Sequence, residues 1–338
     1  MSSLTITPHG PLIGTIVVPG DKSITHRSII LSALAEGESL IQDYCPGEDC
    51  LHTARCFRAM GTEVEETPTQ LRLRGKGLWG LSEPDRILDC GNSGTGIRLM
   101  TGLLSGQDFF SVLTGDDSIR RRPMGRVVKP LREMGAMIAG RKGGELAPLA
   151  VTGRRLRGVT YQSPVSSAQV KSSLLLAGLF AEGETTITEP RQSRDHTERL
   201  FRYLGVPLHG TPTAVTVTGR PSVGWSGFRL RVAGDLSSAA FFLVGATLVR
   251  GSDVTIEHVG MNPTRTGILE VLRQMGANIQ VFNQQDEAGE PVADLRVRSA
   301  SLKGVTVGAD MIPQTIDEFP ILCVAAAFAW GTAAAVAQ

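Results

Sequence analysis

The sequence predicts an α/β protein built from repeated βαβαββ units. Two alternating patterns lead to this prediction. A five-residue motif with arginine second and glycine last recurs at intervals of 70–74 residues, ending at Gly61, Gly135, Gly205 and Gly276. Between its copies lie segments that begin with small polar residues, continue as apolar runs and end at a glycine, at residues 21–37, 91–106, 166–183, 235–251 and 317–331. A fixed period of this kind is typical of repeated supersecondary units.

The third unit shows the elements expected in each. From residue 166 the apolar side chains fall on more than one helical face, which predicts a buried helix, and Gly183 is expected to end it in the left-handed conformation. Residues 184–188 are rich in β-branched side chains and predict a strand. A second helix, capped by Asp195 or Thr197, should end at Gly205. Two further strands follow.

The second and fourth units follow the same order, with prolines at informative places. Pro130 lies inside the second helix of its unit and is expected to kink it. Pro263 suits the first turn of the corresponding helix in the fourth unit. Apolar residues recur there at helical spacing and predict one buried face, formed by Ile268, Val271, Leu272 and Met275.

Composition narrows the class of function. The 338 residues are 41% hydrophobic and 20% charged, as in ordinary globular enzymes, and the net charge of +1 argues against a nucleic-acid or membrane partner. The five cysteines form no C-x-x-C pair and with His52 would make only a weak metal site, so we expect buried reduced thiols and no metal. No cofactor is expected either. No signal peptide and no apolar run of about 18 residues stands out, which favours the cytoplasm.

The first three apolar segments begin with residues suited to anion binding. These starts contain Lys22, Ser23 and Arg27, then Asn92, Ser93, Gly94 and Thr95, then Ser166, Ser167 and Gln169. Helix N-termini attract anions through free N–H groups and the positive end of the helix dipole. The alternative is that these residues are only helix caps. Because Arg98 and Arg122 add further cations, we favour a cleft for a ligand with several phosphates or carboxylates.

Six longer motifs, in this order, resemble the 5-enolpyruvylshikimate-3-phosphate synthase (3-phosphoshikimate 1-carboxyvinyltransferase) family. They are GDKSITHRS at 20–28, GNSGTGIRL at 91–99, LTGDDSIRRRPMGRVVKPLREMGA at 113–136, SSAQVKS at 166–172, SRDHTE at 193–198 and DEFPILCVAAAFA at 317–329. The fourth and fifth are more similar to the glyphosate-tolerant branch. The resemblance implies transfer of the enolpyruvyl group from phosphoenolpyruvate to the 5-hydroxyl of shikimate 3-phosphate, with release of phosphate.

The resemblance also implies the roles of individual residues. Asp317 is expected to be the general base, and Lys22 to touch both substrates. Shikimate 3-phosphate is expected to bind Lys22, Ser23, Arg27, Ser167, the Ala168 backbone, Gln169, Ser193, Arg194 and Asp317. Phosphoenolpyruvate is expected to bind Lys22, Asn92, Gly94, Arg122 and Gln169. No metal is implied.

The family fold implied is an inside-out α/β barrel with two domains. Residues 21–233 would form a complete three-unit domain, and residues 1–20 would join 234–338 in a second one. Two related classes are weaker alternatives. UDP-N-acetylglucosamine 1-carboxyvinyltransferases usually carry a cysteine in an arginine-rich loop, and the loop at 116–122 has none. RNA 3′-terminal phosphate cyclases need a nucleotide-accepting histidine that cannot be placed.

The repeat count predicts that the second domain lacks most of its last unit, because five first segments are followed by only four second ones. Family members continue into a Lys-Glu-Ser-Asp-Arg helix that is not found here. The apolar helix expected at 317–330 would then be buried on one side and exposed on the other. We therefore expect either an enzyme that is inactive alone and completed by a separate chain, or a non-catalytic remnant that binds shikimate 3-phosphate. Otherwise the protein would be a monomer.

Overall fold

A computed structural model describes residues 5, 7, 10–221, 224–309 and 311–335. The chain divides into two compact units. The larger contains Gly20–Val232 and Glu287–Glu290, and the smaller contains Met1–Pro19, Ala233–Asp286 and Pro291–Gln338. The outermost parts of the second predicted domain, residues 1–4 and 336–338, lie outside the described residues. Each unit is described by itself.

The larger unit contains three four-stranded sheets of identical topology. In each, an edge strand runs parallel to its neighbour and the other pairs are antiparallel. The first has the order β15 (Arg229–Arg231), β2 (Glu36–Gln42), β4 (Gln70–Lys76), β3 (Glu63–Glu66). The second has β5 (Leu88–Asp89), β6 (Phe110–Thr114), β8 (Leu146–Thr152), β7 (Met137–Gly140). The third has β10 (Thr160–Gln162), β12 (Glu184–Thr188), β14 (Ala214–Thr218), β13 (Leu208–Thr211). Short β9 (Leu156–Arg157) pairs with β11 (Ala181–Glu182).

The last strand of the larger unit completes its first sheet. Strands β5 and β10 directly precede their sheets in the chain, whereas β15 comes from the end of the unit and pairs with β2, with Arg229 opposite Leu40. The three repeats are therefore closed by the return of the chain.

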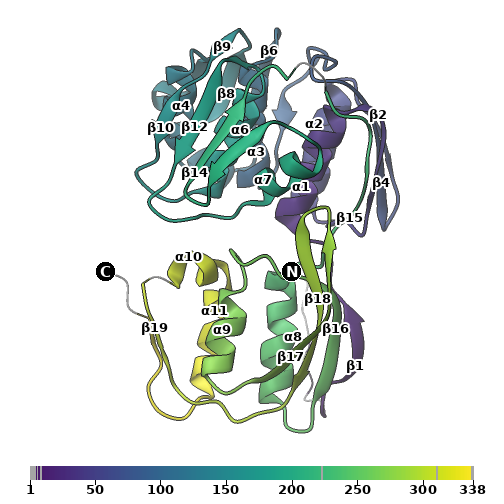
Figure 1. The fold of residues 1–338 in the computed structure, drawn as a ribbon, viewed down its shortest axis with the longest axis vertical. Coiled ribbons are helices and arrows are strands. Elements are labelled where there is room, and N and C mark those ends of the chain that lie inside the picture. The colour runs from purple at the N-terminus through teal and green to yellow at the C-terminus, as the bar shows by residue number, and fades with distance from the viewer. Residues whose placement is uncertain (1–4, 6, 8–9, 222–223, 310, 336–338) are drawn as a thin grey trace. The chain divides into compact units, whose positions relative to one another are not determined.

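Three buried helices lie between these sheets (Figure 1): α1 (Lys22–Ala33), α3 (Gly94–Ser105) and α6 (Ala168–Gly178). From the second helical turn onward their side chains are buried, which confirms the prediction drawn from their apolar faces. The second helix of each repeat buries one face only: α2 (Glu48–Ala59), α4 (Gly125–Glu133) and α7 (His196–Tyr203). Short helical turns are η1 (Ile119–Arg121) and α5 (Arg141–Gly144).

The recurring five-residue motif is a helix C-terminus. Gly205 has φ +73° and follows the cap residue Leu204, and the N–H of Val206 donates to the carbonyl of Phe201 at 2.9 Å. This is the Schellman arrangement, which needs a left-handed residue and so favours glycine. Equivalent bonds close the other three copies: Thr62 to Phe57, Ala136 to Leu131 and Ala277 to Leu272.

Several expected helix boundaries are wrong. Helix α6 ends at Gly178, and Gly183, although left-handed with φ +85°, lies between β11 and β12 because it turns one strand into the next. Asp195 is the N-cap of α7 by position, but its side chain does not bond the helix N–H groups. Thr197 lies inside that helix. Pro130 lies inside α4, within the helix where the sequence expected it.

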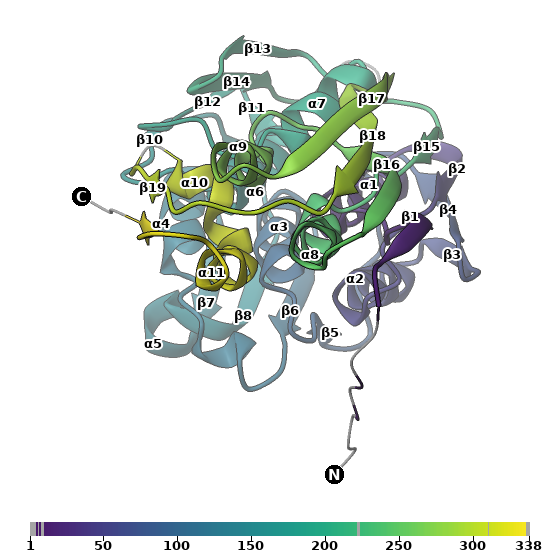
Figure 2. The same ribbon diagram turned by 90° about the horizontal axis from the view of Figure 1, so that it is seen from below.

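The smaller unit has one four-stranded sheet, with the order β1 (Ile13–Val17), β16 (Asp253–Gly260), β18 (Glu290–Arg298), β17 (Asn278–Glu287). Its helices α8 (Leu236–Leu248), α9 (Gly267–Gln274) and α11 (Phe319–Ala327) lie on one side of this sheet (Figures 1 and 2). Pro263 precedes α9 in a turn and not in its first helical turn. The predicted face of α9 is buried, as Ile268, Val271, Leu272 and Met275 show. The remaining elements are β19 (Thr306–Val307), β20 (Ala334–Ala335), α10 (Ile312–Thr315) and η2 (Ile316–Glu318).

The apolar helix α11 is buried on one side only. Leu322 and Ala325 are buried, whereas Val324 is 43% and Phe328 67% exposed, because α11 packs along α8 and leaves its other side uncovered. The expectation of five buried thiols fails here, since Cys323 is exposed on the same helix. No helix in the described residues has the length and apolar character needed to cross a membrane.

Candidate functional site

The N-terminus of α1 presents Lys22 and Ser23. The carboxylate of Asp21 caps the helix by accepting the N–H of Ile24 at 2.9 Å. Lys22 is exposed, and its ammonium forms an ion pair with Asp49 of α2 at 3.1 Å. Ser23 is half-buried one residue further on. This end of α1 therefore offers both a flexible cation and a helix N-terminus to an anionic ligand.

Arg27 lies one turn deeper in α1 and connects it to two other helices. Its Nε donates to the hydroxyl of Thr197 on α7, and its Nη2 donates to the hydroxyl of Ser172 on α6, both at 2.7 Å. Its Nη1 donates to the carbonyl of Ser23. Burial lowers the pKa of Arg27 to about 10, so the guanidinium remains charged at neutral pH. A buried cation is thus held directly beneath Ser23.

The N-terminus of α3 lies beside α1. Ser93 caps α3 by accepting the N–H of Gly96 at 2.9 Å, and Nε2 of His26 lies 3.1 Å from the same Ser93 hydroxyl. A side chain at position 94 would lie 2.8 Å from Nη1 of Arg98 and 3.0 Å from Nη1 of Arg122. Glycine at position 94 leaves room for both guanidinium groups to lie against this helix N-terminus without shifting.

Gln169, in the first turn of α6, joins α6 to α3. Its Oε1 accepts from Arg98 at 2.7 Å and from Arg126 at 2.8 Å, and its Nε2 donates to the hydroxyl of Thr95 at 3.1 Å. Ser167 is the N-cap of α6, and Ala168 is its first residue. The first turns of α3 and α6 therefore meet at one place, as the sequence predicted for the buried helices.

The arginines at this junction lack anionic partners. Within the described residues, no carboxylate forms an ion pair with Arg98, Arg122 or Arg126. Arg98 is only 3% exposed, and its pKa is lowered to about 10 by burial and by the nearby charges of Arg126 and Arg122. A buried guanidinium surrounded by like charges is unfavourable unless an anion joins it. The junction therefore concentrates positive charge of the kind that binds anionic ligands.

Asn92 orients Arg122 within this site. Its Oδ1 accepts from Nη2 of Arg122 at 2.7 Å, and its Nδ2 donates to Asp116 at 2.6 Å. The N–H of Ile119 and the amide of Asn92 lower the pKa of Asp116. Asp116 thus stays ionised and fixes the Asn92 amide, which directs its oxygen towards Arg122.

Ser193 and Arg194 lie in the loop before α7. The N–H of Ser193 donates to Oε2 of Glu189 at 3.2 Å, and its hydroxyl lies 2.8 Å and 2.7 Å from the two Glu189 oxygens. The N–H of Ser167 donates to Oε1 of Glu189 at 2.8 Å. Arg194 is half-buried in the same loop. Glu189 therefore connects the loop of Ser193 to the start of α6.

Asp317 is the only predicted site residue outside the larger unit. It lies in η2 and is exposed, whereas its neighbour Glu318 is buried beside Arg265 and Ser237. A solvent-exposed carboxylate can be reached by a substrate, whereas the buried carboxylate of Glu318 cannot. The contrast agrees with a chemical role for Asp317 and a structural one for Glu318.

The sequence prediction missed two residues of this site. Arg126 lies within the quoted motif at 113–136, four residues after Arg122, and its place in that arginine-rich motif was the available signal. Glu189 follows a strand and no pattern in the sequence marks it. In the described residues, no group of three His, Cys, Asp or Glu side chains could hold a metal ion.

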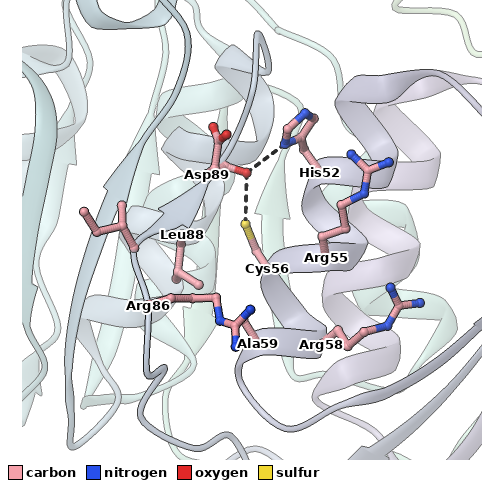
Figure 3. A pocket seen from close by; sticks show the side chains of 9 residues that line it. His52, Arg55, Cys56, Arg58, Ala59, Arg86, Leu88 and Asp89 are labelled. Carbon is pink, nitrogen blue, oxygen red and sulfur yellow. Dashed lines mark hydrogen bonds between the residues drawn. The ribbon is translucent and has the colours of Figure 1, made fainter.

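A cavity of about 520 Å³ between α2 and β5 is separate from these groups (Figure 3). Its arginines already have partners: Arg55 pairs with Glu48, Arg86 with Asp85, and Arg58 donates to the carbonyl of Val64. Asp89 brings a negative charge to the same cavity. Because two of its three arginines are paired with carboxylates and Asp89 adds a negative charge, the lining of the cavity carries less net positive charge than the junction of α3 and α6.

Known proteins with sequences similar to this chain belong to one family. A family model described as EPSP synthase (3-phosphoshikimate 1-carboxyvinyltransferase) matches residues 6–336. The 3-phosphoshikimate 1-carboxyvinyltransferase of Geotalea uraniireducens is 56% identical over 331 residues, which cover 98% of this chain and 77% of the relative. That of Geobacter metallireducens is 54% identical with the same coverage. None of these matches supports a separate chain that supplies a final unit.

Solved structures agree in fold. An EPSP synthase from Acinetobacter baumannii superimposes with a TM-score of 0.89 at 46% identity, covering 97% of this chain and 74% of that one. The enolpyruvyl transferase NikO from Streptomyces tendae gives a TM-score of 0.76 at 17% identity, covering 95% and 74%. The second likeness concerns the fold alone. Together they identify the inside-out α/β architecture expected from the sequence.

Proposed function

Because this chain belongs to the EPSP synthase (3-phosphoshikimate 1-carboxyvinyltransferase) family, we propose that the residues described above bind and activate the two substrates of that reaction. The reaction transfers the enolpyruvyl group of phosphoenolpyruvate to the 5-hydroxyl of shikimate 3-phosphate, in the shikimate pathway of aromatic amino acid biosynthesis. A new C–O bond forms to the enolpyruvyl carbon, and its bond to the phosphate oxygen breaks. The hydroxyl proton must go to a base.

The observation that carries the site assignment is the group of arginines without ionic partners at the start of α3. Phosphoenolpyruvate has a phosphate and a carboxylate, and guanidinium groups bind both well because their N–H donors match planar or tetrahedral oxygen groups. We assign it to the phosphoenolpyruvate-binding set Lys22, Asn92, Gly94, Arg122 and Gln169. Arg98 supplies buried positive charge behind them.

We assign shikimate 3-phosphate to the ends of α1 and α6 and to the loop before α7. Its binding residues are Lys22, Ser23, Arg27, Ser167, the Ala168 backbone, Gln169, Ser193, Arg194 and Asp317. In this assignment Asp317 accepts the proton of the attacking 5-hydroxyl, as an exposed carboxylate can. The partners are these two small molecules, and a monomer in the cytoplasm is the form we propose.

Two measurements test the proposal. Calorimetry should show that the chain binds shikimate 3-phosphate, and phosphate release should require both substrates together. Binding without release would favour the alternative of a non-catalytic chain. Absence of binding by the folded chain would contradict the site assignment itself.

A further inference from the structure

We infer that Glu189 is a positioning residue for the shikimate 3-phosphate site, because its carboxylate fixes the relative positions of the loops that contain Ser167 and Ser193. The inference rests on the proposed function and adds to it a residue that does not touch the substrate. Three observations carry it: the hydrogen bonds of the carboxylate, the number of protons available on Ser193, and the charges around Lys171.

The carboxylate of Glu189 receives donors from both loops. Glu189 follows the last residue of β12, and its own N–H donates to the carbonyl of Thr213 at 2.8 Å, so the sheet fixes its backbone. Its side chain is 1% exposed. One oxygen accepts the N–H of Ser167, and the other accepts the N–H of Ser193. A single group anchored on a sheet thus sets the distance between two ligand-binding loops.

The backbone N–H and the hydroxyl of Ser193 both donate to Glu189. A hydroxyl has one proton, and that of Ser193 lies within 2.8 Å of both carboxylate oxygens. Its N–H is bonded to the same carboxylate. A substrate phosphate offers only acceptors, so Ser193 can donate to it only by giving up Glu189. In the structure the Ser193 hydroxyl is therefore bonded to Glu189, and this bond positions for the substrate the loop that carries both Ser193 and Arg194.

The charge of Glu189 is balanced within the protein. Nζ of Lys171 lies 3.0 Å from Glu189 and 2.8 Å from Glu198, and the Lys171 side chain is 2% exposed. Glu198 in turn raises the pKa of Arg27, which burial lowers. The side chains of Glu189, Lys171, Glu198 and Arg27 thus alternate in charge, in this order, beneath the loops. Without Lys171 and Arg27, Glu189 would repel the phosphate it helps to place.

Glu189→Gln tests this inference because it keeps the size of the side chain but loses its charge. The amide offers one acceptor, and its NH₂ group would face the donors of Ser193 and Lys171. Glu184→Gln is the matched control, since Glu184 is exposed at the other end of β12. The first measurement is amide hydrogen exchange of segments 164–168 and 190–195 without ligand. The second is calorimetric binding of shikimate 3-phosphate.

We expect Glu189→Gln to accelerate exchange in both segments and to weaken binding, each by about tenfold or more, since hydrogen bonds to charged groups are the strong ones. Glu184→Gln should change neither. Glu189→Asp, which keeps the charge on a shorter arm, should restore part of both. Ser193→Ala should accelerate exchange of 190–195 without ligand, which a serine that touched only the ligand would not do.

Unchanged exchange in Glu189→Gln and Ser193→Ala would overturn the inference. Faster exchange with unaltered affinity would also overturn it, since the loops would then not need to be positioned. If Glu189→Gln fails to fold, the result for Ser193→Ala decides. If the unmutated chain binds no shikimate 3-phosphate, the proposed function fails, and the exchange comparison still shows whether Glu189 holds the loops.

Discussion

Nε2 of His26 lies 3.1 Å from the hydroxyl of Ser93, and Nδ1 lies 2.8 Å from the hydroxyl of Thr53. One buried imidazole thus joins α1 to the N-cap of α3 and to α2. Burial lowers the pKa of His26 from 6.5 to about 3, outweighing the opposing effect of Asp49. The ring is therefore neutral in the folded protein, and one of its nitrogens accepts a hydrogen bond.

His26 should make the protein less stable in mild acid. The unfolded state takes up a proton below pH 6.5 and the folded state only near pH 3, so the contribution is complete above pH 6.5 and is lost as the pH falls. One such group changes the free energy of unfolding by about 1.4 kcal/mol per pH unit in this window. In His26→Gln, the free energy of unfolding measured with urea between pH 6 and pH 4 should depend on pH less steeply, by about that amount. His209→Gln, at an exposed histidine, should keep the original slope.

Arg194→Ala should weaken binding of shikimate 3-phosphate by about 1.5–3 kcal/mol, the range for hydrogen bonds to charged groups. Calorimetry measures this directly. Arg202→Ala removes an exposed arginine from α7 and is the control. Equal affinities for the two variants would show that Arg194 does not touch the ligand.

Arg122→Ala should impair phosphoenolpyruvate and spare shikimate 3-phosphate, because Arg122 belongs to the junction of α3 and α6 and not to the loop of Ser193. Titration of phosphoenolpyruvate at saturating shikimate 3-phosphate should give a dissociation constant raised about tenfold or more. Arg121→Ala is the neighbouring control, since Arg121 is exposed and bonds the carbonyl of Asp117. A similar loss in both variants would indicate a general effect of charge in this turn.

Asp317→Asn should separate binding from chemistry. The amide keeps the shape of the carboxylate but cannot accept the hydroxyl proton, so phosphate release should fall by about 10²–10⁴-fold while shikimate 3-phosphate binding changes much less. Asp108→Asn, at an exposed aspartate, should leave both unchanged. Release at the original rate by Asp317→Asn would exclude Asp317 as the base.

Local sequence patterns predicted the elements of the fold well where backbone geometry demands a residue type. The glycines at 61, 135, 205 and 276 were identifiable because each closes a helix in the left-handed conformation. Gly183 has the same conformation but turns between two strands, so its φ alone did not fix a helix end. Pro263 lies in the turn before α9, because proline suits turns as well as first helical turns.

The site residues that lie in sequence motifs could be predicted from the sequence. Lys22, Arg27 and Arg122 lie in motifs that resemble the family, and their charge by itself predicts an anion site. Glu189 could not be found in this way. It follows a strand, and its partners Ser167 and Ser193 meet only through tertiary folding. A buried carboxylate that organises others has no local signature.

Helices α3 and α6 approach each other closely at Gly102. A side chain at position 102 would place its Cβ 2.1 Å from the backbone carbonyl oxygen of Ser173, so Gly102→Ala must push the two helices apart. Overpacking of this kind costs about 1–3 kcal/mol. It should also displace Gln169 from Thr95 and Arg98, because these residues span the same pair of helices.

Gly245→Ala in α8 is the matched control. The added methyl group would meet only Cδ1 of Leu12, at 3.6 Å, an ordinary contact. Alanine is the better helix former by about 0.5–1 kcal/mol, so this variant should be as stable as the original chain or more stable. Only Gly102→Ala should lose stability in urea unfolding and affinity in phosphoenolpyruvate titration. Destabilisation of similar size in both variants would mean that helix interiors in general, and not the contact of α3 with α6, are sensitive to the change.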